Sequence, residues 1–216
     1  MKSAESYGMS SRDYLERAET LLHKGGAAEL FYAAFEIRCG IESRMLEYLN
    51  AWDHISKSKK KGWKISEIAR NLESEFKLQN KTIRWAAHHK VTGELLSCLY
   101  HTPVSPVLQD CGEKLGNYLH SMKQSRQMND PWWTDFRHLL SSSSAKLREA
   151  NTGTLLGPPL MKVGSNEVRM QIEIHDRSNP SMPLLDMKGA PFISRIDYLD
   201  SLPDELESQS HRWPGY

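Results

Sequence analysis

Residues 27–51 most constrain the fold of this chain, because they predict one long helix that carries two charges within its apolar stripe. At about 100° per residue, Arg38 and Glu42 lie one turn apart in the middle of that stripe. Charges taken out of water cost several kcal/mol each unless they are paired and hydrogen-bonded. We therefore predict that the two side chains pair, either to set the register of packed helices or to form a polar cleft or subunit interface. The predicted apolar stripe consists of Leu30, Phe31, Ala34, Phe35, Ile41, Met45, Leu46 and Leu49, and the predicted solvent side of Tyr32, Glu36, Ser43, Glu47 and Asn50.

The composition is that of an ordinary globular protein. The chain has 216 residues, of which 39% are hydrophobic and 25% charged, which suits one domain with at most a small appendage. Its net charge of +1 argues against a strongly electrostatic nucleic-acid binder but allows a local basic patch. There is no run of about 18 apolar residues and no apolar core of a signal peptide. The sequence therefore predicts a cytoplasmic protein without a membrane partner.

The three cysteines give no sign of a disulfide framework or a metal site. Cys39, Cys98 and Cys111 lie far apart, on segments that the apolar pattern predicts to be helical. We expect buried thiols in a reducing compartment, and no metal ion or other cofactor.

Capping and breaking residues divide the first 150 residues into helices. Ser10 or Ser11 can cap a helix that ends at about Lys24, and the pair Gly25-Gly26 separates it from the long helix. So short a turn predicts two antiparallel helices. Ser105 followed by Pro106 is a further helix start. The remaining helices are predicted at residues 65–76, 82–100, 106–123 and 131–150.

The pattern changes to strands near the C-terminus. Residues 166–175 alternate strictly between apolar and polar side chains, which predicts a half-buried strand. Residues 160–163 can pair with it, and residues 192–196 can add a third strand. We therefore predict a mainly α protein, with an antiparallel helical bundle at 1–150, a small C-terminal β-hairpin or three-stranded element at 151–200 and a flexible tail at 201–216.

Histidines near predicted helix ends are candidates to complete a polar cluster around Arg38 and Glu42. They are His101, which precedes a Thr-Pro stop, and His120, at the end of the segment GNYLH. The alternative is that each is a hydrogen-bonded structural residue.

If the protein acts on RNA, the basic loop at residues 57–64 is a candidate surface for it. Its lysines could bind phosphates and its tryptophan could stack on a base. The alternative is a solvated lysine-rich loop. The residues concerned are Lys59, Lys60, Lys61 and Trp63.

Several segments resemble a known superfamily. They are FEIRCGIESRMLEYL in the long helix and the predicted helix ends SCLYH and GNYLH. With the antiparallel helix pair, they resemble the HEPN superfamily of helical proteins over about residues 10–150. Many HEPN proteins are metal-independent ribonucleases of bacterial toxin and phage-defence systems. Their active site has an arginine, four to six further residues and a histidine, usually brought together with its copy across a dimer.

The segment from Arg84 to His89 has this spacing on a late predicted helix. The resemblance implies an RNA-acting homodimer, with metal-independent endoribonuclease activity. His89, or the adjacent His88, would move the 2′-hydroxyl proton and Arg84 would hold the phosphate. Two other pairs have the same spacing, Arg17 with His23 and Arg169 with His175.

Two alternatives to a ribonuclease stay open at this point. The first is a non-catalytic helical interaction module that binds a partner protein or a small ligand through a cleft at Arg38 and Glu42. The second is a small-molecule enzyme that uses the same two residues with a histidine.

Overall fold

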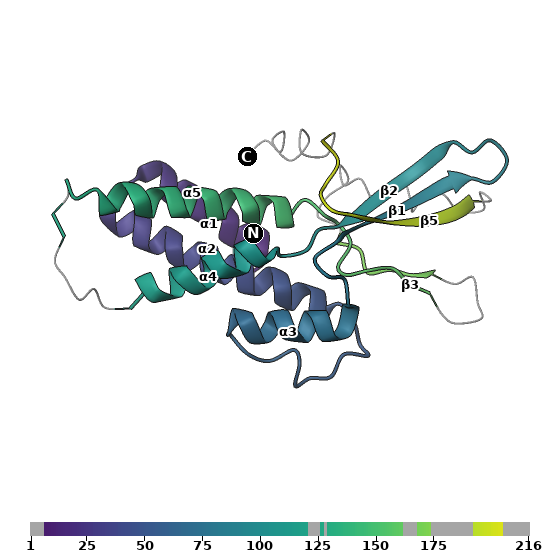
Figure 1. Cartoon of the computed structure of the whole chain (residues 1–216), viewed down its shortest axis with the longest axis horizontal. Coiled ribbons are helices and arrows are strands. Elements are labelled where there is room, and N and C mark those ends of the chain that lie inside the picture. Colours follow the sequence, from purple (N-terminus) through teal and green to yellow (C-terminus); the bar gives the residue numbers. More distant parts are fainter. Residues whose placement is uncertain (1–6, 121–125, 128, 162–167, 174–191, 205–216) are drawn as a thin grey trace, which may run out of the picture.

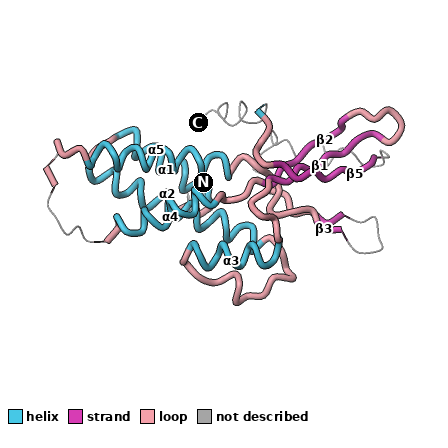
Figure 2. The backbone as a smooth tube through the Cα atoms, viewed as in Figure 1, coloured by secondary structure: helices cyan, strands magenta, loops and turns pink. Residues whose placement is uncertain are grey.

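The computed structural model is mainly helical, with an antiparallel sheet at one end (Figure 1). It describes residues 7–120, 126–127, 129–161, 168–173 and 192–204. The helices gather at one end of the molecule and the strands at the other (Figure 2). The predicted combination of mainly helical structure with a small β element is confirmed, but two of the five described strands come from residues 82–101, most of which were predicted to be helical.

The first two helices form the predicted antiparallel pair. Helix α1 (Ser11–Lys24) begins with a capping box, in which Ser10 accepts from the Asp13 amide and the Asp13 carboxylate accepts from the Ser10 amide. It ends at Gly25, whose φ of 72° lies in the left-handed region that glycine adopts most readily. Helix α2 (Ala27–Asn50) follows at once. Local sequence signals therefore located both helices correctly.

Helix α2 lies at the centre of the helical part and contacts each of the other four described helices. The other three are α3 (Ile65–Phe76), α4 (Pro106–Tyr118), which Ser105 caps, and α5 (Trp132–Ala150). Leu30, Ile37, Ile41 and Leu49 of α2 are at most 2% exposed, within one apolar core. Burial of such side chains contributes about 1.5–3 kcal/mol each, so α2 organises the fold.

The buried face of α2 differs from the predicted one. Glu36, expected in solvent, is 8% exposed, whereas Phe35, expected in the core, is 49% exposed. The reason is the approach of α1 and α5 at Gly40, where an added Cβ would lie 2.7 Å from Leu147 and 3.2 Å from Tyr14. These neighbours cover a side of α2 that a helical wheel assigns to solvent.

Arg44 is the fully buried charge of α2, with 0% exposure. Its guanidinium bridges α2 to the segment after α5 and to the strand region, and so joins the helical and β parts. Charged hydrogen bonds of this kind offset the cost of burial. Its partners are Glu47 Oε2 at 3.1 Å, Glu173 Oε2 at 2.8 Å, Tyr48 Oη at 2.9 Å and the carbonyls of Ala150 at 3.1 Å and Gly153 at 2.6 Å.

The predicted helix at residues 82–100 is wrong. Strands β1 (Thr82–His89) and β2 (Leu95–His101) form an antiparallel hairpin instead. Gly93, with a φ of 73°, lies in the turn between them, and Val91 there is 83% exposed. The apolar spacing fitted a helix, but Trp85 and Leu99 pair across the hairpin within a second small core.

Strand β5 (Phe192–Leu199) completes the sheet, in the order β2-β1-β5. It was predicted as a third strand beside residues 160–175, and this pairing is wrong, because β5 pairs with β1 along all eight of that strand's residues. The expected hairpin partners do pair as β3 (Leu160–Met161) and β4 (Val168–Arg169). The sheet thus combines a hairpin from within the helical sequence with a distant strand.

Some predictions concern residues outside the described part. These are the outer ends of the predicted strand at 166–175, including His175, residues 162–163 of its predicted partner, residues 205–216 of the predicted tail, and residues 121–123 of the helix predicted at 106–123. In the part that the structure describes, no helix is long and apolar enough to cross a lipid bilayer. The division into domains at residues 150 and 200 stays a prediction.

Candidate functional site

A cleft of about 360 Å³ lies where α2 faces α4 and the loop before α3. It contains three of the four members of the predicted polar cluster, Arg38, Glu42 and His120, together with the tryptophan of the basic loop, Trp63. We call it the Arg38 cleft. Its lining residues are Phe35, Arg38, Cys39, Glu42, Trp63, Glu113, Gly116, Asn117, Leu119 and His120.

Arg38 is held in place while part of its guanidinium stays available. Its Nη2 lies 3.0 Å from Glu42 and donates to the Trp63 carbonyl at 3.4 Å. The Trp63 ring centre is 5.8 Å from the guanidinium carbon. Arg38 lies against α4 near Gly116, where an added Cβ would be 3.4 Å from Nε, an ordinary contact distance. Among the described residues, Nε is buried without a hydrogen-bond partner, so the terminal guanidinium nitrogens are the donors that can reach an anion in the cleft.

Glu42 lies at the edge of this cleft in an environment suited to proton transfer. Burial raises the pKa of its carboxyl; the positive charge of Arg38 opposes this rise, and the negative charge of Glu113 adds to it. The exposed imidazole of His120 lines the same cleft. A carboxyl with a raised pKa in a cleft that also contains an imidazole and a guanidinium is a candidate functional group.

The predicted catalytic residues Arg84, His88 and His89 do not come together within one chain. All three lie on β1, where successive side chains point to opposite faces. Arg84 and His89 therefore face opposite ways, about 17 Å apart along the strand. Arg84 forms an ion pair with Asp197 at 3.1 Å and donates to the Cys98 sulfur at 3.2 Å. The two histidines contact the hairpin turn, with His88 Nδ1 3.2 Å from the Gly93 carbonyl and His89 Nδ1 accepting from the Thr92 amide.

The lysines of the basic loop are partly committed within the chain. Lys59 contacts Glu75 at 2.5 Å, and Lys60 donates to the Trp52 carbonyl at 2.8 Å. Lys61 is exposed, and Trp63 is 66% exposed at the Arg38 cleft. Of the predicted RNA-binding residues, Lys61 and Trp63 are thus the most accessible.

His101, predicted to join the polar cluster, lies in a different place. It lines a second cavity, of about 520 Å³, between the end of β2, α3 and α4. We call this the helix–sheet cavity; it shares no lining residue with the Arg38 cleft. His101 is 2% exposed, and its ring centre is 4.6 Å from that of Tyr48. Burial lowers the pKa of His101 to about 4, and the charge of Arg44 adds to this effect.

This buried histidine makes the stability of the protein depend on pH. The unfolded chain binds the proton near pKa 6.5 and the folded chain only near 4, so acidification favours unfolding. Between pH 7 and pH 5, the wild type should lose about 2 kcal/mol of unfolding free energy more than His101→Gln. Urea denaturation of both proteins at both pH values measures the difference. Equal losses in the two proteins would contradict the buried neutral state.

Comparisons of the chain with protein-family models, with curated proteins and with solved structures find no match. The geometry must therefore carry the functional argument. Sequence reasoning missed the contribution of α4 to the cleft. Glu113, Gly116 and Asn117 follow helical spacing and so share one side of α4, and His120 lies two residues beyond its end. No local signal indicates that this side faces Arg38.

Proposed function

We propose that this protein is a HEPN-like, metal-independent endoribonuclease that acts at the Arg38 cleft. The observation that carries the proposal is the placement of Arg38, Glu42 and His120 around one cleft with an exposed tryptophan, Trp63. A base, an acid and a fixed cation are the groups that RNA cleavage without a metal requires. The proposed activity is the one predicted from the sequence, but the proposed active site is the Arg38 cleft and not Arg84 and His89.

The proposed reaction is an attack of the ribose 2′-oxygen on the adjacent phosphorus. Glu42 accepts the proton of the 2′-hydroxyl, and its raised pKa makes it a stronger base than an ordinary carboxylate. The bond from phosphorus to the 5′-oxygen breaks, and His120 donates its proton to that oxygen. Arg38 stabilises the negative charge that builds on the phosphoryl oxygens. The products are a 2′,3′-cyclic phosphate and a 5′-hydroxyl.

Trp63 gives the cleft a surface on which a base can stack. Base–aromatic stacking is worth about 1–3 kcal/mol and tolerates any sequence. With Lys61 exposed on the same loop, this supports a single-stranded RNA substrate. The toxin or phage-defence setting and the homodimer belong to the proposal through the HEPN resemblance.

The proposal is tested by incubating the purified chain with single-stranded RNA in the presence of EDTA. We expect fragments that end in a 2′,3′-cyclic phosphate, and a rate about 100-fold lower for His120→Ala. His89→Ala is the matched control and should cleave as the wild type does. RNA that stays intact at high protein concentration would contradict the proposal, as would loss of activity in His89→Ala alone.

A non-catalytic interaction module is the second candidate, and the apolar rim of the same cleft favours it. Phe35 is 49% exposed, Trp63 66% and Leu119 37%, so the cleft could hold an apolar segment of a partner protein. This candidate predicts intact RNA and a specific co-purifying partner that is lost in Phe35→Asp. Ribonuclease activity that depends on His120 would exclude it.

A further inference from the structure

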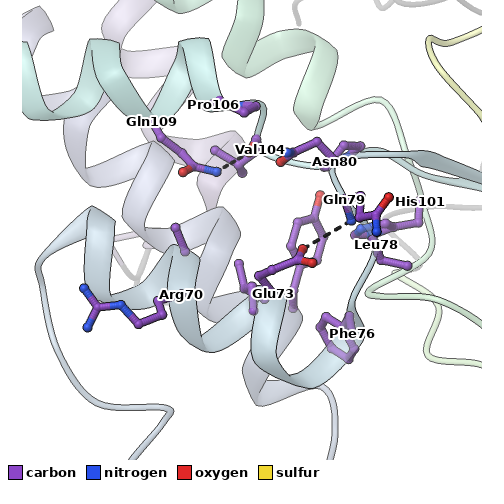
Figure 3. A pocket seen from close by; sticks show the side chains of 14 residues that line it. Arg70, Glu73, Phe76, Leu78, Gln79, Asn80, His101, Val104, Pro106 and Gln109 are labelled. Carbon is purple, nitrogen blue, oxygen red and sulfur yellow. Dashed lines mark hydrogen bonds between the residues drawn. The ribbon is translucent and has the colours of Figure 1, made fainter.

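The helix–sheet cavity is separate from the Arg38 cleft and has the properties of a small-molecule site. Its volume of about 520 Å³ lies within the range of ligand pockets. Figure 3 shows Glu73 and Phe76 of α3 on one side of it and Gln109 of α4 on another. His101 and Tyr48 contribute to its buried end.

His101 presents an unsatisfied polar atom in the wall of this cavity. Its Nδ1 lies 3.2 Å from the Leu155 carbonyl and 3.3 Å from the Gly157 amide nitrogen, so the backbone occupies that side of the ring. In either tautomer, Nε2 has no hydrogen-bond partner in the part of the chain that the structure describes. Nε2 is absent from the fully buried unsatisfied atoms of the described residues, so it keeps accessible surface although the residue is 2% exposed, and a ligand in the cavity could form a hydrogen bond with it.

The loop that borders the cavity is held in a strained backbone conformation. Lys77, Gln79 and Asn80 have φ values of 52°, 49° and 60°. They are the non-glycine residues with positive φ in the described segments, and Gln79 and Asn80 line the cavity. Strain of this kind persists where the surroundings require it and clusters at ligand sites. Lys77 is the left-handed C-cap of α3, and asparagine adopts this region more readily than most residues. Gln79 is therefore the position at which backbone strain supports a binding site.

The lining chemistry indicates the class of ligand. Leu72, Phe76 and Val104 provide apolar walls suited to a flat ring. The side-chain amides of Gln79, Asn80 and Gln109 each offer donors and acceptors. The Gln109 amide donates to the Val104 carbonyl at 2.7 Å, which leaves its oxygen as an acceptor toward a ligand. The charged lining residues, Glu73 and Arg70, have opposite signs.

From these observations we propose that the helix–sheet cavity binds an uncharged heteroaromatic ring of the nucleobase class, presented as a nucleoside. The ring packs between the apolar walls, and its polar edge meets Nε2 of His101 and the side-chain amide of Gln79. The site goes beyond the proposed ribonuclease activity and does not depend on it.

Titration calorimetry of the full chain with adenosine, guanosine, cytidine and uridine tests the proposal, with ribose 5-phosphate as a charged compound that lacks a base. We expect saturable binding of at least one nucleoside and none of the sugar phosphate. Leu72→Trp fills the cavity and should weaken binding about 10-fold or more, and Gln79→Ala should also weaken it. Val107→Trp adds the same side chain at a position on α4 that is 55% exposed and outside the cavity, and should bind as the wild type does.

The variant Trp63→Ala distinguishes nucleoside binding in the helix–sheet cavity from base stacking on Trp63 at the Arg38 cleft. Nucleoside binding should survive this change, because Trp63 lies outside the helix–sheet cavity. Binding that is lost in Trp63→Ala and kept in Leu72→Trp would overturn the proposal. So would the absence of saturable binding by all four nucleosides, or binding of ribose 5-phosphate alone. RNA cleavage by the wild type is measured separately. Whether or not the wild type cleaves RNA, the nucleoside-binding results are interpreted in the same way.

Discussion

Replacing Arg44 with methionine is expected to lower the free energy of unfolding by about 3–5 kcal/mol. Arg44 is fully buried and its guanidinium donates to two carbonyls and two carboxylates. Methionine fills a similar volume but donates no hydrogen bond. The buried carbonyl of Gly153 would lose its 2.6 Å donor, and Tyr48 would lose the 2.9 Å donor to its hydroxyl. The helical and β parts would also lose their bridge.

Urea denaturation, followed by circular dichroism, measures this effect. Arg38→Met is the matched control, because the Arg38–Glu42 pair lies at the surface of the cleft, with side-chain exposures of 12% and 21%. We expect it to lose about 1–2 kcal/mol, because this pair is only partly buried and keeps some contact with solvent. Arg44→Lys keeps the charge but not the planar fork, and should fall between the two. Equal losses for Arg44→Met and Arg38→Met would mean that Arg44 does not carry the packing of α2.

Removing the guanidinium of Arg38 is expected to reduce RNA cleavage by about 100- to 1000-fold. In the proposed reaction this group stabilises charge that appears only in the transition state, so Arg38→Ala should lower kcat more than it raises KM. Arg38→Lys keeps the charge without the paired donors and should recover part of the rate. Single-turnover cleavage of a labelled oligonucleotide in EDTA measures both variants.

Arg84→Ala is the control that distinguishes the two possible locations of the active site. It removes the arginine of the HEPN-like spacing, whose partner in this structure is Asp197 at 3.1 Å. We expect cleavage close to that of the wild type. Loss of cleavage in Arg84→Ala with normal cleavage in Arg38→Ala would return the site to the β1 hairpin, where only a second copy of the chain could bring Arg84 and a histidine together.

Local signals predicted the helices well. The capping residue Ser10, the Gly25-Gly26 break and the Ser105-Pro106 start all mark helix boundaries in the structure. These signals act within one turn of the chain, so they can be evaluated without knowing what packs nearby. The segment at residues 82–100 has a Thr-Pro stop after His101 but no capping residue that marks a helix start. Its apolar residues fitted helical spacing, but the pairing of β1 with β5, which lies about a hundred residues later, decides its conformation.

The sequence predicted several residues of the candidate site, but not how these residues are arranged in space. The pairing of Arg38 with Glu42 follows from their separation by one turn, and the structure contains it at 3.0 Å. The same separation says nothing about what lies opposite. His120 lines the cleft because α4 packs against α2. His101, at the end of β2, instead contacts the Leu155 carbonyl in the chain after α5.

The sequence by itself determined where the main helices begin and end and that two of them form an antiparallel pair, because caps and glycines act through neighbouring residues. It also determined that α2 carries charges which need partners. Only the tertiary structure decided which charge is buried. The approach of α1 and α5 at Gly40 covers the side of α2 that bears Arg44, and leaves Arg38 and Glu42 at the edge of a cleft. Burial depends on which surfaces meet, and contacts between segments distant in sequence set that choice.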